Sequence, residues 1–348
     1  MTQKKQITLQ DIASELGVSK VAVSKALRDH PDISIETKAL VQKTAVSLGY
    51  VPNFMARNLS TRRSNTIGLV VPKVAHHFFA EAIEAIYETA DAYDYEIIMT
   101  VSQEDADNEL KHIQTLLSMR VDGLLISVTE QTRDLAIFET IKKRKIPIVF
   151  FDRVIENFGV SCVTSDDEQG TFDAISQLIF SGYSKIAHLG GYSSSTIGKN
   201  RMQGYLRAIK EFNLDIPQSW IVESGYGEEC GYTGFKKLFK SGPLPEVIFT
   251  VTYPVALGVI LAAQELELTI TDDFELLCFG GSNYNRFINP SLSYIKQPIY
   301  KTGQRAVEIL IHEIMNPEHQ PSQLKLPTEL VICETCKGKS GGILDGQV

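Results

Sequence analysis

The sequence has few cysteines, a single tryptophan and no long apolar run. Its 348 residues include five cysteines, an odd number scattered along the chain, which argues against a disulfide framework. The longest apolar runs have the length of strands, which argues against a membrane-spanning helix. The first residues are polar and basic, whereas a signal peptide would have an apolar core. These features predict a cytoplasmic protein that makes no contact with a membrane.

Positive charges outnumber negative charges only in the N-terminal part of the chain. Residues 1–63 hold ten Lys and Arg and five Asp and Glu, a net charge of +5, whereas the whole chain has −8, which leaves −13 for the remainder. A basic end on an acidic body directs that end toward a polyanion. The length is sufficient for two or three domains.

Three short helices are predicted in the basic segment. Thr8, followed three residues later by an acidic residue, has the pattern of an N-cap, and Ser19 and Ser34 are the expected caps of the second and third helices. Gly17 and Gly49 stand where the first and third helices should end. Two short helices joined by a glycine-containing turn are typical of the helix-turn-helix motif. The predicted inward positions are Val23, Ala26 and Leu27 in the second helix and Ile35, Leu40, Val41, Ala45 and Leu48 in the third.

The outward face of the second helix carries Lys20, Ser24, Lys25 and Arg28, and Val21 lies at its N-terminal end. Lys and Ser can bind bases or phosphates, whereas Val can only contact a thymine methyl group or fill a gap. The pattern therefore predicts a DNA-binding head. The alternative is a small helical bundle with a solvated basic face.

Four segments make the DNA-binding hypothesis specific, because together they resemble the lactose/galactose-repressor family of bacterial transcription regulators. They are residues 7–13 (ITLQDIA), 17–19 (GVS), 23–27 (VSKAL) and 50–59 (YVPNFMARNL). The resemblance implies a DNA-contacting surface and, in residues 51–65, a hinge helix and linker that enters the minor groove, with an apolar wedge between base steps. The implied DNA contacts are Thr8, Ser19, Lys20, Val21, Ser24, Lys25, Arg28, Ser34 and Thr37 in the head, and Asn53, Ala56 and Leu59 in the hinge, with Leu59 as the wedge.

Two residues of the second helix depart from the family pattern. The family usually has Thr where this chain has Ala22, and Arg where it has Lys25. Lys keeps the charge but loses the bidentate fork of a guanidinium group, so the base preference at this position is open.

The chain beyond residue 65 alternates apolar runs with amphipathic segments. This order predicts two α/β blocks with parallel sheets covered on both faces, and therefore two lobes with a ligand site beyond the strand ends. The resemblance implies the two-lobed fold of periplasmic sugar-binding proteins, with three crossings between the lobes. We expect a helix-turn-helix domain in 1–50, a two-lobed effector-binding and dimerisation domain in 66–336, and a disordered tail in 337–348. Predicted strands are 67–71, 96–101, 123–128, 146–151, 160–165, 185–189, 247–251, 274–279, 293–297 and 329–333, and predicted helices are 79–93, 107–119, 135–144, 168–181, 199–212, 255–267 and 299–315.

The predicted ligand site combines aromatic, acidic and basic side chains at strand ends, which suits a sugar. Each one alone could instead be a core residue, a local ion pair or a surface charge. The resemblance implies effector contacts from Phe79, Asp152, Arg201 and Tyr226, together with the position of Thr252.

Two positions in the second lobe depart from the family pattern. The family usually has Asn-Asp where this chain has Thr252 and Tyr253, and an Asp where it has Gly280. A two-acceptor grip on sugar hydroxyls is therefore missing. Either the ligand is not an ordinary free sugar, or other groups hold it, or the lobe responds weakly.

Other motifs are weak. Residues 190–195 lack the ending of a phosphate-binding P-loop, Cys333 and Cys336 form a lone CxxC motif, and His76 and His77 have no identifiable metal partners. We expect no catalytic residues, no metal and no cofactor. The sequence thus predicts a ligand-responsive regulator, most often a repressor of carbohydrate-utilisation genes, that binds a pseudo-palindromic operator as a homodimer and responds to a sugar or sugar derivative. The alternative is a solute-binding protein without a DNA role.

Overall fold

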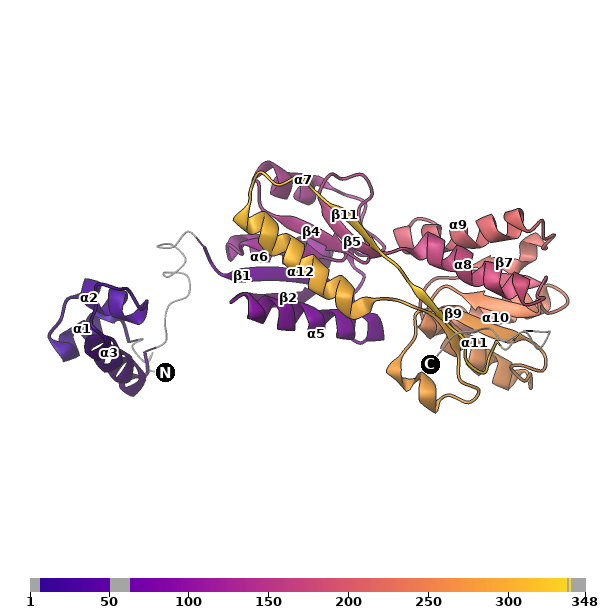
Figure 1. Ribbon diagram of the computed structural model, residues 1–348, viewed down its shortest axis with the longest axis horizontal. Helices are drawn as coiled ribbons and strands as arrows, with labels where there is room; N and C mark the ends of the chain where they lie inside the picture. The colour runs from indigo at the N-terminus through magenta and orange to yellow at the C-terminus, as the bar shows by residue number, and fades with distance from the viewer. Residues whose placement is uncertain (1–6, 51–62, 337, 339–348) are drawn as a thin grey trace. The chain divides into compact units, whose positions relative to one another are not determined.

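The computed structural model describes residues 7–50, 63–336 and 338 (Figure 1). The chain divides into two compact units, Met1–Ser64 and Asn65–Val348. The predicted hinge contacts Asn53, Ala56 and Leu59, and nearly all of the predicted tail, lie outside the described residues.

The first unit is helical. Its elements are α1 (Leu9–Leu16), α2 (Lys20–Leu27) and α3 (Ile35–Leu48). The predicted cap forms, because the backbone nitrogen of Thr8 donates to Oδ2 of Asp11 at 2.8 Å. Gly17 and Gly49 adopt the left-handed conformation, with φ of 64° and 68°, that ends a helix at little cost only for glycine. The small core comprises Ile12, Ala13, Val23, Ala26, Val41 and Ala45.

Two residues predicted to face this core do not. Ile35 is 84% exposed and Leu40 is 52% exposed. The part of α3 that packs on the other helices is a narrow stripe through Val41, Ala45 and Leu48. At about 100° per residue, positions 35 and 40 lie roughly 100–120° to either side of that stripe. Ile35 and Leu40 are apolar but lie outside the face of α3 that packs on the other helices, which is why they are exposed.

The first lobe of the second unit contains a six-stranded sheet in the order β11-β5-β4-β3-β1-β2, with every pair parallel. Helices α5 and α12 cover one face and α6 and α7 the other (Figure 1). The strands are β1 (Thr66–Val71), β2 (Glu96–Val101), β3 (Gly123–Ile126), β4 (Ile148–Phe151), β5 (Ser161–Ser165) and β11 (Gln323–Leu326). The helices are α5 (His77–Ala92), α6 (Ala106–Ser118), α7 (Ala136–Lys143) and α12 (Ile299–Met315).

The second lobe repeats this plan with the order β12-β10-β9-β8-β6-β7, in which only the β10–β12 pair is antiparallel among the described strands. Helices α10 and α11 cover one face and α8 and α9 the other. The strands are β6 (Ile186–Gly190), β7 (Ile221–Glu223), β8 (Val247–Thr250), β9 (Glu275–Phe279), β10 (Ser293–Lys296) and β12 (Glu329–Val331). The helices are α8 (Asp167–Phe180), α9 (Thr196–Glu211), α10 (Glu228–Lys240), α11 (Tyr253–Glu265), and the short η1 (Gln218–Trp220) and η2 (Asn283–Phe287).

The chain passes between the two sheets three times, after β5, after β10 and after β11. The fold therefore agrees with the two-lobed arrangement that the family resemblance implied. The carboxyl ends of β1, β3 and β4 lead into loops that meet loops of the second lobe, and this is where the candidate site lies. Within the described part of the chain, no helix has the length and apolarity needed to cross a bilayer.

Candidate effector cleft and DNA-binding face

Most of the predicted DNA-facing residues of the head are polar, and several of them form hydrogen bonds with residues close by in the sequence. Ser19 Oγ accepts from the backbone nitrogen of Ala22 at 3.0 Å, and Ser34 Oγ accepts from that of Thr37 at 3.3 Å. Both hydroxyls thus cap the helices that they precede. Val21 is 65% exposed, although it is apolar, at the N-terminal end of α2. An exposed valine at this place suits an apolar contact in a groove.

Lys25 in α2 and Arg28, which directly follows α2, are held by partners within the head. Arg28 Nη2 donates to Ser24 Oγ at 2.9 Å, and Arg28 Nε donates to the Ser24 carbonyl oxygen at 3.0 Å. Lys25 Nζ lies 2.7 Å from Oδ2 of Asp32 in the turn before α3, and this ammonium group lowers the pKa of the Asp32 carboxyl. The Lys25 charge is therefore partly neutralised in the free head.

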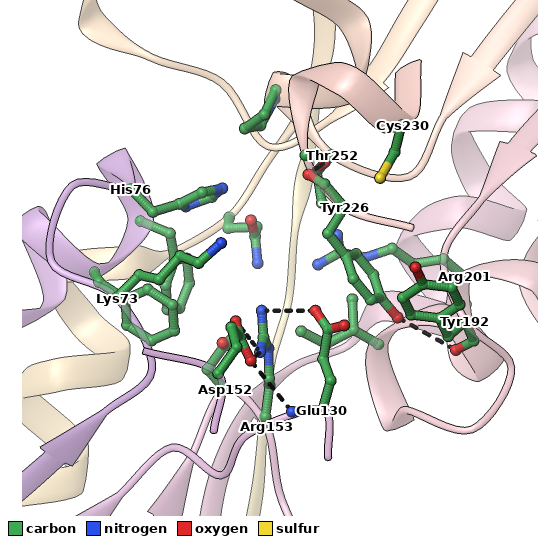
Figure 2. Close-up of a pocket in the computed structure, with 17 residues that line it drawn as sticks. Lys73, His76, Glu130, Asp152, Arg153, Tyr192, Arg201, Tyr226, Cys230 and Thr252 are labelled. Atoms are coloured by element: carbon green, nitrogen blue, oxygen red, sulfur yellow. Dashed lines mark hydrogen bonds and ion pairs between the residues drawn. The ribbon is translucent and has the colours of Figure 1, made fainter. Parts of the chain in front are cut away.

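A cavity of about 270 Å³ lies between the two lobes and is lined by residues from both (Figure 2). The structure brings all five predicted effector residues to it: Phe79, Asp152, Arg201, Tyr226 and Thr252. It adds residues that sequence reasoning did not select, namely Lys73, His76, Glu104, Glu130, Arg153 and Gln297. That these residues contact a ligand stays a prediction.

Arg153 occupies the floor of the cleft, directly after β4, and joins both lobes. Its Nη1 donates to both carboxylate oxygens of Glu104, at 2.7 and 2.8 Å, and its Nη2 lies 3.5 Å from Oε1 of Glu130. Its guanidinium carbon is 6.0 Å from the ring centroid of Phe79 in the first lobe and 5.6 Å from that of Tyr226 in the second. These are cation–π distances, so one charged group contacts aromatic rings on either side of the cleft.

Asp152, the neighbour of Arg153, has an unusual backbone and an unusual charge state. Its φ of 59° lies in the left-handed region that Asp and Asn enter more readily than most side chains. Burial raises the pKa of its carboxyl from 3.8 to about 7, against the opposing effect of Arg153 and Arg201. Near neutral pH this group can therefore either donate or accept a hydrogen bond.

Arg201, on α9, is buried at the second-lobe side of the cleft and is 2% exposed. Its Nη1 donates to the carbonyl oxygen of Val251 at 2.6 Å, and its Nη2 lies 3.3 Å from both oxygens of Asp167. The guanidinium carbon is 3.7 Å from the ring centroid of Phe279. The alternative that Arg201 is a surface helix charge is wrong, because the side chain is buried and its terminal nitrogens contact these partners.

Two family models match the chain: the one described as bacterial regulatory proteins of the lacI family matches residues 8–53, and the one described as periplasmic binding proteins and sugar binding domain of LacI family matches residues 64–334. The chain belongs to the LacI family of bacterial transcription regulators.

Individual relatives agree with this assignment. The catabolite control protein A of Priestia megaterium is 32% identical over 95% of this chain and 99% of its own length. The HTH-type transcriptional repressor PurR of Actinobacillus pleuropneumoniae serotype 3 is 28% identical over 93% and 97%. The crystal structure of the lac repressor dimer bound to operator and the anti-inducer ONPF superposes with a TM-score of 0.84 at 23% identity, over 95% of this chain and 99% of that one. The last likeness concerns the fold.

This LacI-family protein uses Thr252, one of its two departures from the family pattern, to position an aromatic residue. Thr252 Oγ1 donates to the carbonyl oxygen of Tyr226 at 2.8 Å. The Tyr226 hydroxyl contacts Ser195 Oγ and donates to the carbonyl oxygen of Tyr192 at 3.3 Å. The two tyrosine rings pack edge to face at 5.9 Å. The Thr252 hydroxyl therefore holds the aromatic wall of the cleft.

At the other departure, neighbouring side chains occupy the space beside the glycines. Gly280 has a φ of +78°, and a Cβ added there would lie 3.0 Å from Gln297 Oε1. A Cβ added at Gly281 would lie 2.4 Å from Tyr294 Cδ2. Gln297, on the second crossing between the lobes, lines the cleft and donates through Nε2 to Ser165 Oγ at 3.3 Å. An amide thus lies beside the position where the family usually has a carboxylate.

The glycine-rich loop, the CxxC motif and His76 lie at different places in the second unit. Tyr192, in the loop 190–195, lines the cleft, and Ser195 caps α9 by accepting from the backbone nitrogen of Gly198 at 3.1 Å. Cys336 is buried and Cys333 is partly buried, and within the described residues no group of His, Cys, Asp and Glu is arranged to hold a metal. His76 lines the cleft, where burial lowers the pKa of its imidazole to about 4.

Proposed function

We propose that this LacI-family regulator represses carbohydrate-utilisation genes by binding a pseudo-palindromic operator as a homodimer, and that a sugar or sugar derivative in the cleft changes its affinity for the operator. The observation that carries this proposal is the cleft itself. Its lining comes from both lobes of the same chain that bears the helix-turn-helix head.

A ligand in this cleft would be sensitive to the arrangement of the lobes. Arg153 and Phe79 belong to the first lobe, whereas Tyr226, Arg201 and Thr252 belong to the second. A molecule that contacts both sets favours whichever arrangement fits it, and the operator favours one arrangement of the two heads. The two binding events are then linked reciprocally, and a factor of about 10–100 in operator affinity corresponds to about 1.4–2.7 kcal/mol of coupling.

The proposal also includes the location of the protein, the absence of sugar turnover and the domain boundaries. We place the protein in the cytoplasm, where operator DNA is accessible, and we expect no turnover of sugars. The proposed boundaries are a head in 1–50, a hinge and linker in 51–65, and an effector-binding and dimerisation domain in 66–336. A solute-binding protein without a DNA role is less well supported, because the family match includes the head.

Selection from a random double-stranded library tests the proposal directly. The full-length protein should enrich sites with two inverted half-sites, and the enriched sequences should compete for binding far better than random DNA at the same salt concentration. A variant with Lys20→Ala and Arg28→Ala should lose most of this enrichment. No enrichment by the wild-type protein, with and without a panel of sugars, would contradict the proposed function.

The pairing of Lys25 with Asp32 leads to a further prediction for the head. Replacing Asp32 by Asn removes the carboxylate that holds Lys25 Nζ at 2.7 Å, so the ammonium group becomes free to bind DNA. We expect operator affinity at low salt to rise about two- to threefold. The slope of log affinity against log salt should steepen by about 0.9 if one phosphate contact is gained.

Asp29→Asn is the matched control for that variant. Asp29 pairs with Lys38 at 2.8 Å, and Lys38 is not among the predicted DNA contacts. Both variants change the net charge of the head equally, so a general electrostatic effect would raise both affinities alike. Equal gains in a fluorescence-anisotropy titration would show that Asp32 does not act through Lys25.

A further inference from the structure

We propose that the effector of this protein is an uncharged, hydroxyl-rich molecule, such as a neutral sugar, and that the cleft disfavours acidic and phosphorylated ligands. The inference rests on the proposed function, in which the cleft is the effector site. It follows from the way in which the charges of the cleft are already paired.

Positive and negative side chains line the cavity in equal number. The basic residues do not form a patch that an anion could occupy alone, because acidic residues of the first lobe lie among them (Figure 2). The charged residues are Lys73, Arg153 and Arg201, and Glu104, Glu130 and Asp152.

Both arginines have partners inside the protein. The terminal nitrogens of Arg153 face Glu104 and Glu130, and those of Arg201 face Asp167 and the Val251 carbonyl oxygen. Proteins bind carboxylates and phosphates most strongly through a free guanidinium fork. An anionic ligand could obtain such a fork here only by displacing a carboxylate that is half-buried beside Arg153 or buried beside Arg201, and that carboxylate would then lose its partner.

The third basic residue does not supply the missing fork. Lys73 is exposed, and its single ammonium group offers a point charge without a planar pair of donors. A phosphate near Lys73 would also lie in the same cavity as the carboxylates of Glu104 and Glu130, which repel it.

The groups that remain for a ligand suit hydroxyls and a sugar ring. Within the described residues the Asp152 carboxyl makes no hydrogen bond, and Gln297 offers an amide from the crossing between the lobes. The Tyr192 side chain, 41% exposed, adds an aromatic face beside Tyr226. A carboxylate can accept hydrogen bonds from two neighbouring hydroxyls, and an aromatic face packs against the C–H groups of a sugar ring.

Inorganic phosphate is a probe that does not require the natural ligand to be known. At low millimolar phosphate and constant ionic strength, we expect no specific rise in the melting temperature of the full-length protein. The double variant Glu104→Gln and Glu130→Gln keeps the hydrogen-bond acceptors but frees the charge of Arg153. We expect it to bind phosphate at least about tenfold more tightly than wild type. A gain of about tenfold in affinity is what one additional hydrogen bond to a charged group contributes.

A second double variant separates this effect from a general change in charge. Glu265→Gln and Glu329→Gln remove the same two charges from exposed pairs with Lys236 and Lys296, outside the cleft. This variant should behave like wild type. If the cleft variant folds poorly, Glu130→Gln alone makes the same test, because Glu130 faces Arg153 at 3.5 Å.

Three results would overturn the inference. The first is stabilisation of the wild-type protein by phosphate that Arg153→Met abolishes, and the second is a failure of the cleft variant to bind phosphate more tightly than wild type. The third, in a panel of neutral sugars each paired with its uronate and its phosphate ester, is tighter binding of an acidic member than of its neutral parent. These measurements concern the cleft alone, so they fail independently of the proposed function, whose failure would appear as an absence of enriched DNA sites.

Discussion

Replacing Arg201 by Met is expected to lower the free energy of unfolding by about 3–5 kcal/mol, because it leaves the buried carboxylate of Asp167 without its partner. Arg201 is 2% exposed, lies 3.3 Å from both oxygens of Asp167 and stacks on Phe279 at 3.7 Å. Met fills part of the volume but replaces none of these interactions. Urea titration of the full-length protein at pH 7 measures the change in the free energy of unfolding.

Arg207 provides a control on the same helix. Its Nη1 lies 2.8 Å from Oε1 of Glu168, the residue after Asp167, and its guanidinium carbon lies 4.0 Å from the ring centroid of Phe172. The pair has the same chemistry but is about one-third exposed. Arg207→Met should therefore cost no more than about 1 kcal/mol.

The comparison isolates burial as the cause of the Arg201 effect. Combining Arg201→Met with Asp167→Asn removes both charges and should recover part of the loss, because the uncompensated carboxylate disappears. Equal losses for Arg201→Met and Arg207→Met would contradict the conclusion that the buried pair differs from the exposed one.

The fold could be predicted where the local pattern is strong. The strand Glu96–Val101 and the helix Ile299–Met315 have the predicted bounds, because each is a continuous apolar run or a long amphipathic repeat. Most other predicted elements are shifted by one to three residues at their ends. The strands β7 (Ile221–Glu223) and β11 (Gln323–Leu326) were not predicted, because three and four residues are too few to form a recognisable run.

Helix α10 was missed for a different reason. Gly231 and Gly234 interrupt its apolar pattern and suggest a loop. In the structure they allow α10 to approach its neighbours closely, because a Cβ at Gly231 would lie 2.0 Å from the Val255 carbonyl oxygen on α11, and one at Gly234 would lie 2.6 Å from Leu189 Cδ2 on β6. Whether a glycine ends a helix or permits close packing depends on a partner that the local sequence does not contain.

In the candidate site, some residues could be predicted from the sequence, whereas the pairings between them could not. Glu104 and Glu130 follow β2 and β3 as Asp152 follows β4, so the rule that selected Asp152 could have selected them too. The pairings could not be predicted, because Arg153 and Glu104 are 49 residues apart and Arg201 and Asp167 are 34 apart. Such contacts depend on the register of the sheet and on the packing of α8 against α9, which only the folded chain defines.

Replacing Asp152 by Asn is expected to stabilise the protein at and above neutral pH. The pKa of the carboxyl is about 7 in the folded protein, because of burial, and 3.8 is its ordinary value. Between these values the folded protein binds more protons than the unfolded chain, so this group makes stability fall as pH rises from 4 to 7 and leaves it level above. This rise in the pKa corresponds to at most about 4 kcal/mol, and because Asp152 keeps some contact with solvent, which screens its charge, we expect about 2–4 kcal/mol.

Asn removes this charge and keeps the backbone, because Asn also enters the left-handed region that Asp152 occupies at φ 59°. The stability of the variant minus that of wild type should be near zero at pH 4 and should grow until about pH 7. The half-buried His76 and the buried His188, whose pKa is lowered to about 4, change stability in the opposite direction over part of this range, but they do so in both proteins and cancel in the difference.

Asp94→Asn is the control, because Asp94 has a φ of 60° on an exposed turn and lines no part of the cleft. It should change stability by less than about 0.5 kcal/mol at pH 8. If Asp152 is kept as a ligand contact at the expense of stability, the more stable Asp152→Asn protein should also respond less to its effector, since one charged acceptor is lost. A variant that is stabilised and fully responsive would show that the carboxylate serves some purpose other than holding the ligand.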